Sequence, residues 1–325
     1  MTQWPAVSVI MPVLNEEAYL QAAVSAILQQ EYPGTLHIVL ALGPSTDRTD
    51  AVAQSLAQSD SRITLVANPS GKTADGLNAA IAASHDDIIV RVDAHTELSA
   101  GYISTAIETI QRTNADNVGG IMNATGQTPF EQAVAAAMKS PFGVGAASFH
   151  TGGNEGPADT VYLGVFKRSA LNRVGGYDPH FVRAQDWEMN HRIRETGGTV
   201  WFNPAMTVSY RPRPNAKKLA KQYFEYGTWR REVMRTHPET VSRKSALRYF
   251  APPAAVLGTL LGALLVFLGW GFGWFPIIGY AAIEVIATLL LIGKAKRGWF
   301  YVPLVLLIMH WSWGIGFLTS RAKKR

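Results

Sequence analysis

The fold is decided by an apolar segment near the N-terminus, Val7-Ser8-Val9-Ile10-Met11, which stops at Pro12. β-Branched and apolar residues with little polar alternation are typical of a strand buried on both faces of a parallel sheet. Similar strands are expected at 36–42, 62–67, 88–92 and 117–122. Helices with apolar residues three and four positions apart are expected at 17–30, 47–59, 73–84 and 98–113. This alternation predicts an α/β fold, a Rossmann-like, mostly parallel sheet with helices on both faces.

Polar motifs follow these strands, and ligands of parallel sheets bind beyond the carboxyl ends of the strands. The first strand leads into Pro12-Val13-Leu14-Asn15-Glu16-Glu17, and the fourth into Arg91-Val92-Asp93-Ala94-His95. Three more motifs follow along the chain: Gly175-Gly176-Tyr177-Asp178, Gln185-Asp186-Trp187-Glu188, and Gln222 to Arg230 on a predicted helix.

Taken in order, these motifs resemble the family 2 glycosyltransferases of the GT-A fold over about residues 6–235. Each motif alone is weak, whereas five in order at plausible spacing are specific. The resemblance is closest to membrane-attached members that build bacterial polysaccharides, the succinoglycan-type glucosyltransferases. It implies an inverting enzyme that uses a nucleotide diphosphate sugar.

Asp93 and His95 occupy the place where the family has Asp-x-Asp. The resemblance implies that both bind a divalent metal, Mn²⁺ or Mg²⁺, and that Asp93 also contacts the donor. Such a cation can neutralise the charge that develops on the leaving diphosphate. Imidazole suits Mn²⁺ better than Mg²⁺, which prefers oxygen ligands. The alternative for His95 is a helix cap near Leu98.

Asp186 matches the family's catalytic aspartate, the general base that takes the proton of the acceptor hydroxyl. Gln185 stands before it, where the family usually has an acid. The alternative is that Asp186 caps a helix over 187–195, and Glu188 is a lesser candidate for the base.

Pro12, Leu14 and Glu16 match positions that line the nucleotide pocket in this family. At the end of the second strand, Leu42 replaces the aspartate with which the family reads the uracil edge. The identity of the base therefore stays open.

Lys72 and Asn78 follow the third strand, where the family's donor pocket has its glycine-and-asparagine segment. The resemblance implies that both border the donor, and the alternative for Lys72 is a solvated lysine. Gly71-Lys72-Thr73 also resembles the end of a phosphate-binding P-loop, but Val66 replaces the glycine that this motif requires.

A basic region lies between Arg211 and Arg248, where eleven residues are Lys or Arg. Within it, Gln222, Trp229 and Arg230 resemble the Gln-x-x-Arg-Trp element of membrane-attached members, which implies contacts to the acceptor and the diphosphate. The alternative is an amphipathic interfacial helix, and the two interpretations are compatible. Because the region adjoins apolar segments, we expect membrane lipids as its partner and no nucleic acid.

The C-terminal part is apolar enough to enter a membrane. Glu284 is the sole charged residue from Tyr249 to Gly293, and the block 299–319 has none. Hydropathy predicts transmembrane helices at about 251–270, 272–293 and 301–319. Three spans leave the basic C-terminal residues opposite the other basic segments, against the positive-inside rule, and the alternative is an interfacial or re-entrant last helix. Glu284 and His310 could contact each other or a lipid headgroup.

The sequence thus predicts a GT-A catalytic domain at 1–212, a basic interfacial segment at 213–248 and a transmembrane region at 249–325. We expect transfer of a sugar to a lipid-linked or polysaccharide acceptor, with a multi-pass protein in the cell (inner) membrane and its catalytic domain in the cytoplasm. The absence of cysteine excludes thiol nucleophiles and disulfides. Two alternatives remain: a catalytically degenerate partner in a glycan-assembly complex, and a sugar nucleotidyltransferase that releases pyrophosphate. Three spans are too few for a transporter acting alone.

Overall fold

A computed structural model describes residues 4–145, 147–241 and 243–322. It divides into two compact units. The first runs up to Asn123 and from Gly152 to Tyr210, and the second comprises Ala124–Thr151 and the chain from Arg211 onwards. The chain leaves the first unit for good after Tyr210, and Ala124–Thr151 packs with the C-terminal part of the chain. The domain boundaries at residues 212 and 248 stay predictions.

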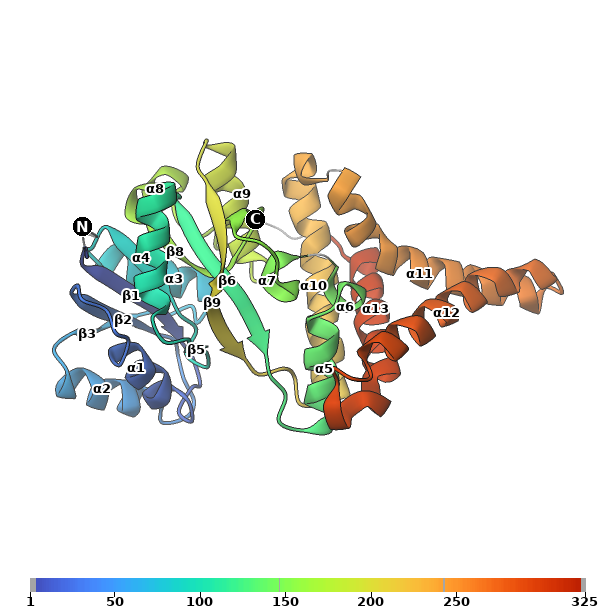
Figure 1. The fold of residues 1–325 in the computed structure, drawn as a ribbon, viewed down its shortest axis with the longest axis horizontal. Helices are drawn as coiled ribbons and strands as arrows, with labels where there is room; N and C mark the ends of the chain where they lie inside the picture. The colour runs from blue at the N-terminus through green and yellow to red at the C-terminus, as the bar shows by residue number, and fades with distance from the viewer. Residues whose placement is uncertain (1–3, 146, 242, 323–325) are drawn as a thin grey trace. The chain divides into compact units, whose positions relative to one another are not determined.

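The first unit is built on one mixed sheet (Figure 1). Its strands are β1 (Val7–Val13), β2 (Leu36–Leu42), β3 (Ile63–Ala67), β4 (Ile88–Arg91), β5 (Glu97–Leu98), β6 (Asn117–Ala124), β7 (Gly156–Pro157), β8 (Tyr162–Lys167) and β9 (Val200–Tyr210). Its helices are α1 (Leu20–Leu28), α2 (Thr49–Ser59), α3 (Thr73–Ala83), α4 (Tyr102–Thr113), α8 (Arg168–Val174) and α9 (Gln185–Glu195).

The strand order is β3-β2-β1-β4-β8-β6-β9-β5, with β7 paired to β9. β1 to β4 pair in parallel, as predicted, and Val9 of β1 lies opposite Ile38 on one side and Val90 on the other. β8 pairs antiparallel with β4 and β6, and β9 pairs antiparallel with β5 and β7. The sheet is therefore mixed beyond β4, because apolar runs locate strands but carry no information on their direction.

Helices cover both faces of the parallel strands, as predicted. Successive strand residues point to opposite faces. Val7, Val9 and Met11 pack with apolar residues of α1 and α4 in one cluster. Ile10, between them, is buried on the other face, where α3 packs against β1 and β2.

Two predicted helices begin later than expected. The helix predicted at 98–113 starts at Tyr102, after Gly101 with φ +68°, and Leu98 instead belongs to β5, which pairs with β9. The helix predicted at 17–30 covers Leu20–Leu28. The preceding residues are held by hydrogen bonds to the loop after β2, which compete with helix formation.

The second unit is helical. Its helices are α5 (Pro129–Met138), α6 (Pro141–Val144), α7 (Ser148–Thr151), α10 (Ala216–Thr236), α11 (Arg243–Phe267), α12 (Trp274–Leu291) and α13 (Val302–Thr319), with 3₁₀ turns η1 (Pro238–Thr240), η2 (Gly271–Gly273) and η3 (Lys296–Tyr301). Three segments are long and apolar enough to cross a membrane: Tyr249–Phe267, Gly271–Leu291 and Lys296–Thr319. They correspond closely to the predicted spans.

Candidate active site

The centre of the first unit is Arg91, the last residue of β4. The residue is 4% exposed, and its guanidinium lies between two carboxylates. Nη1 pairs with Asp186, and Nη2 donates to Oδ1 of Asp93 over 3.1 Å. Burial by itself lowers the pKa of an arginine, but the charges of Asp186 and Asp93 outweigh it and raise the pKa of Arg91. Arg91 therefore stays a cation and joins two residues that are 93 positions apart in the chain.

Asp186 is carried by the first turn of α9. This helix begins at Gln185, after Ala184 in the left-handed conformation with φ 63°, so Asp186 does not cap it as the alternative interpretation supposed. Burial raises the pKa of Asp186 to about 6, an effect that the neighbouring charge of Arg91 limits and that of Asp93 reinforces. A carboxylate with a pKa near neutrality is suited to general base catalysis.

His95 is held by Glu16, from the loop after the first strand. Its Nδ1 lies 2.9 Å from Oε1 of Glu16. A carboxylate on Nδ1 favours the tautomer in which Nε2 is the basic nitrogen, as in many metal-binding histidines. Glu16 is thus brought to His95, two residues after Asp93, although 79 residues separate Glu16 from His95 in the chain. A carboxylate and an imidazole fit a divalent cation, and Mn²⁺ better than Mg²⁺.

The loop after β1 is fixed to the loop after β2. Asn15 accepts a hydrogen bond from the Thr46 amide at 2.8 Å, and the Glu16 amide donates to Oγ1 of Thr49, also at 2.8 Å. Leu14 is exposed and lies near Gly43. Pro12, half-buried at the end of β1, and Leu14 therefore stand at the strand ends where the donor was predicted.

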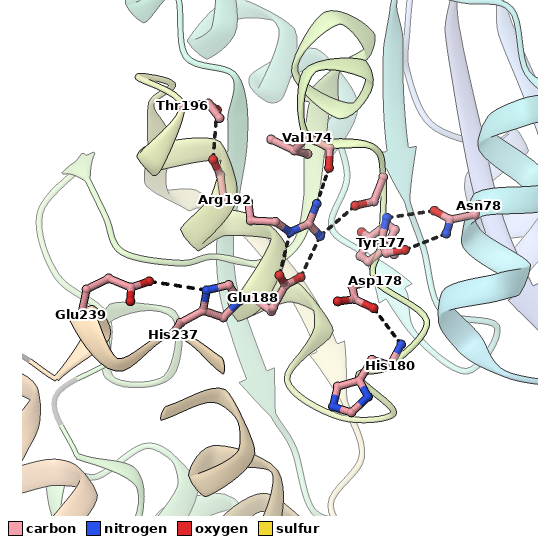
Figure 2. A network of polar contacts seen from close by, with 11 residues as sticks. Asn78, Val174, Tyr177, Asp178, His180, Glu188, Arg192, Thr196, His237 and Glu239 are labelled. Carbon is pink, nitrogen blue, oxygen red and sulfur yellow. Dashed lines mark hydrogen bonds and ion pairs between the residues drawn. The ribbon is translucent and has the colours of Figure 1, made fainter. Parts of the chain in front are cut away.

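Asn78 holds the turn after α8. Its side-chain amide donates to the carbonyl of Tyr177 at 2.7 Å and accepts from the Tyr177 amide at 2.9 Å, as Figure 2 shows. The Tyr177 ring in turn packs under the Arg91 guanidinium, 5.5 Å from its centre. The structure thus gives Asn78 a positioning role, and a direct contact with the donor stays a prediction.

Glu188 supports the same turn from the other side. Its carboxylate forms a bidentate ion pair with Arg192, at 2.6 and 2.7 Å. Arg192 also donates to the backbone carbonyls of Val174 and Gly176 (Figure 2). Because both oxygens of Glu188 are engaged by Arg192, Asp186 is the better candidate for the base.

The remaining predicted residues come just before α3 and from α10. Lys72 is exposed just before α3. Gln222, Trp229 and Arg230 belong to α10 of the second unit. There, Gln222 donates to the Tyr226 hydroxyl at 2.7 Å, and Arg230 stacks on the ring of Tyr249 at 4.7 Å. Their contacts with donor and acceptor stay predictions.

Sequence reasoning assigned no role to Arg91, although the motif contains it. The signal was a charged residue at the end of the otherwise apolar strand 88–92. Arginine is seldom buried without a partner, so an arginine in a buried strand predicts that carboxylates from other parts of the fold pair with it. Asp186 could not be identified as that partner from the sequence, because only the folded chain brings α9 next to β4.

The sequence model of glycosyl transferase family 2 matches residues 8–175, which include most of β1, the Asp93–His95 motif and Gly175. The chain belongs to glycosyl transferase family 2. It is a glycosyltransferase with the GT-A fold, as the resemblance of the motifs predicted.

Two curated relatives match this family 2 chain over most of its length. The succinoglycan biosynthesis protein ExoA of Rhizobium meliloti is 28% identical over 312 residues, 95% of this chain and 93% of that protein. A Methanococcus voltae enzyme is 24% identical over 98% of this chain and 97% of its own. It is a dolichyl N-acetyl-α-D-glucosaminyl phosphate 3-β-D-2,3-diacetamido-2,3-dideoxy-β-D-glucuronosyltransferase.

A solved structure has the same fold. The mannosyltransferase PcManGT from Pyrobaculum calidifontis, in complex with GDP-Man and Mn²⁺, superposes with a TM-score of 0.69. The match covers 98% of this chain and 88% of that one at 18% identity. At this identity the likeness concerns the fold, which extends through the C-terminal helices.

Proposed function

We propose that this glycosyltransferase moves a sugar, with inversion, from a nucleotide diphosphate donor to a lipid-linked or polysaccharide acceptor at the cytoplasmic face of the cell membrane. The proposal rests chiefly on one observation: Asp186, with its pKa raised to about 6, lies beside Arg91 and the Asp93 motif at the strand ends. Relatives that act in succinoglycan biosynthesis and on a dolichyl-linked sugar support the acceptor class.

In the proposed reaction, Asp186 accepts the proton of an acceptor hydroxyl as the hydroxyl oxygen bonds to the anomeric carbon. The bond between that carbon and the diphosphate breaks, and the nucleoside diphosphate leaves with the electron pair. Arg91 keeps the Asp186 carboxylate oriented and limits its pKa. Glu16 holds His95 through Nδ1.

Asp93 and His95 would hold a divalent cation. The mannosyltransferase neighbour was solved with Mn²⁺, which supports a divalent cation in this fold. When bound, the cation supplies positive charge to the leaving diphosphate. Pro12, Leu14, Lys72 and Asn78 would border the donor, and Gln222, Trp229 and Arg230 the acceptor and diphosphate. The donor base is open, because the residue at the uracil position is Leu42.

The test is release of nucleoside diphosphate from a panel of UDP-, GDP- and dTDP-sugars, with Mn²⁺, in detergent supplemented with lipid-linked acceptors. Wild type should turn over one donor, and Asp186→Asn should lose about 10²–10⁴-fold in kcat while still binding that donor. Asp159→Asn changes an 87% exposed aspartate of the same unit and should leave the rate unchanged. Full activity of Asp186→Asn would refute the assignment of the base, and release of pyrophosphate would identify a nucleotidyltransferase. Absence of donor binding by wild type would favour the degenerate partner.

A further inference from the structure

The three apolar C-terminal segments differ in how far protein covers them. We compare the most apolar 18 residues of each segment. The buried share of these residues is 17% in Tyr249–Phe267 and 11% in Gly271–Leu291, but 39% in Lys296–Thr319. A helix that crosses a bilayer next to two others exposes most of its surface to lipid. The last helix, α13, is instead covered in part by other helices of its unit.

The C-terminal half of α13 lies directly against α10. A Cβ at Gly227 of α10 would overlap the carbonyl of Trp313, and one at Gly316 of α13 would overlap the carbonyl of Phe224. The final carbonyls of α13 are bound by cations of α10: Arg231 donates to the Phe317 carbonyl at 2.8 Å. Arg235 donates to the Ser320 carbonyl at 2.6 Å.

α10 is too polar to lie in hydrocarbon. Between Ala216 and Thr236 it contains Lys217, Lys218, Lys221, Arg230, Arg231 and Arg235, besides two glutamates. Each charge at the bilayer centre costs about 2.5–3.5 kcal/mol on insertion scales. The part of α13 that contacts α10 must therefore lie at the depth of the headgroups.

The N-terminal half of α13, up to His310, is held by α5 and α6, in the same unit. A Cβ at Gly298, just before α13, would overlap the carbonyl of Pro129 in α5, and the Arg297 amide donates to Gln132 at 3.2 Å. Nε2 of His310 lies 2.7 Å from the Phe142 carbonyl of α6. Buried Glu131 of α5 also pairs at 3.0 Å with Arg211, which precedes α10 in the chain. One half of α13 therefore contacts α5 and α6, and the other half contacts α10.

The remaining face of α13 is apolar and exposed at Leu304, Leu307 and Ile315. α11 and α12 differ: apolar residues are exposed along them, and their link carries exposed aromatics at Trp270, Phe272 and Trp274. In Figure 1, α11 and α12 extend together away from the rest of this unit, while α13 runs across their direction, alongside α10. His310 joins α13 to α12 through Glu284 at 2.9 Å, which confirms that these two residues contact each other.

We infer that only the α11–α12 hairpin crosses the membrane and that α13 lies in the plane of the bilayer surface, on the side of α5 and α10. The exposed apolar face of α13, with Leu304, Leu307 and Ile315, is turned to the acyl chains. The aromatic link between α11 and α12 reaches the headgroups of the opposite leaflet. The C-terminus then lies on the same side as the basic region 211–248 and Lys294, Lys296 and Arg297. This arrangement obeys the positive-inside rule, which three spans would break.

The cysteine-free sequence allows a direct test on the full chain. Single variants Ser59→Cys in α2, Gly271→Cys in the hairpin link and Ala322→Cys after α13 are placed in sealed vesicles and treated with a membrane-impermeant maleimide. Ala322→Cys should be labelled from the same side as Ser59→Cys, and Gly271→Cys from the opposite side. If Ala322→Cys were labelled from the same side as Gly271→Cys, the protein would have three spans and the inference would be overturned. The test compares only which cysteines lie on the same side of the membrane, so its result is independent of the proposed reaction.

A depth measurement gives a second, independent readout. Leu304 and Ile315 are eleven positions apart, about 16 Å along a helix. Spin labels at Leu304→Cys, Leu307→Cys and Ile315→Cys should report equal depths if α13 lies in the plane of the surface. A steady change of depth of the order of 16 Å between the first and the last would show that α13 crosses the bilayer.

Discussion

Arg91 is the residue on which the candidate site depends, because it links the motif after β4 to the aspartate on α9. Its charge opposes the effect of burial on Asp186, so that the carboxylate can act as a base near neutrality. Without such a cation, burial alone would keep Asp186 protonated to higher pH.

Replacing Arg91 should therefore change the pH dependence of activity. For wild type we expect kcat/KM to rise with pH through an inflection near 6, because the reaction needs ionised Asp186. In Arg91→Gln the pKa of Asp186 should rise, and the inflection should move to higher pH. Arg91→Lys keeps the charge and should keep the inflection closer to that of wild type. A pH profile of Arg91→Gln with an unchanged inflection would show that Arg91 does not act on the titrating group.

His95 should determine which metal supports activity. His95→Asp supplies the oxygen ligand that Mg²⁺ prefers, so the ratio of rates with Mn²⁺ and with Mg²⁺ should fall about tenfold. His37 offers a matched control, because it is also 48% exposed and its Nδ1 lies 2.8 Å from a carboxylate, that of Asp86. His37→Asp should leave the ratio unchanged. An equal effect of the two variants, measured after chelator treatment and metal titration, would argue against His95 as a ligand.

At the scale of elements, the turn between α8 and α9 connects the scaffold to the site. Asn78 and Arg192 hold its backbone, and Tyr177 packs under Arg91. Gly175 and Gly176 both have positive φ, at 76° and 74°, so a side chain at either is strained. They differ in space, because a Cβ at Gly176 would lie 2.6 Å from Oδ1 of Asn78, whereas nothing lies within 4 Å of one at Gly175.

Gly176→Ala should consequently cost more than Gly175→Ala. Backbone strain alone destabilises each variant by about 1–2 kcal/mol. The overlap with Asn78 should add to this in Gly176→Ala and lower kcat by displacing Tyr177. Adding Asn78→Ala to Gly176→Ala should relieve the overlap, which a double-mutant cycle on the melting temperature would detect. Identical losses in the two glycine variants would mean that Asn78 does not constrain the turn.

At the scale of the whole molecule, the chain leaves the catalytic unit at residue 124 and returns at residue 152, so the second unit is assembled from two segments. α5 in the first of these segments has buried Ala133, Val134 and Ala137. Its Glu131, fully buried, pairs with Arg211 of the second segment. Residues 124–151 therefore depend on segments that follow Tyr210, and this dependence is visible only in the folded chain.

A chain that ends at Tyr210 should aggregate, because it leaves the apolar face of α5 uncovered and Glu131 without Arg211. Replacing residues 124–151 of that shortened chain by a Gly-Ser linker of equal length should restore a soluble monomer, as size-exclusion chromatography can show. If the shortened chain without the linker were already soluble and monomeric, α5 would not need the C-terminal segments.

The sequence by itself determined the α/β alternation, the position of the parallel strands and the three apolar segments, because these depend on the local period and length of apolar residues. It also pointed to Asp93, His95 and Asp186 as candidate site residues, because each belongs to a contiguous motif. Only the tertiary structure decided that β8 runs antiparallel next to β4, that Arg91 joins Asp93 to Asp186, and that α10 covers α13. Those contacts join residues that are distant in the chain, and local pattern contains no information about which distant partner a side chain meets.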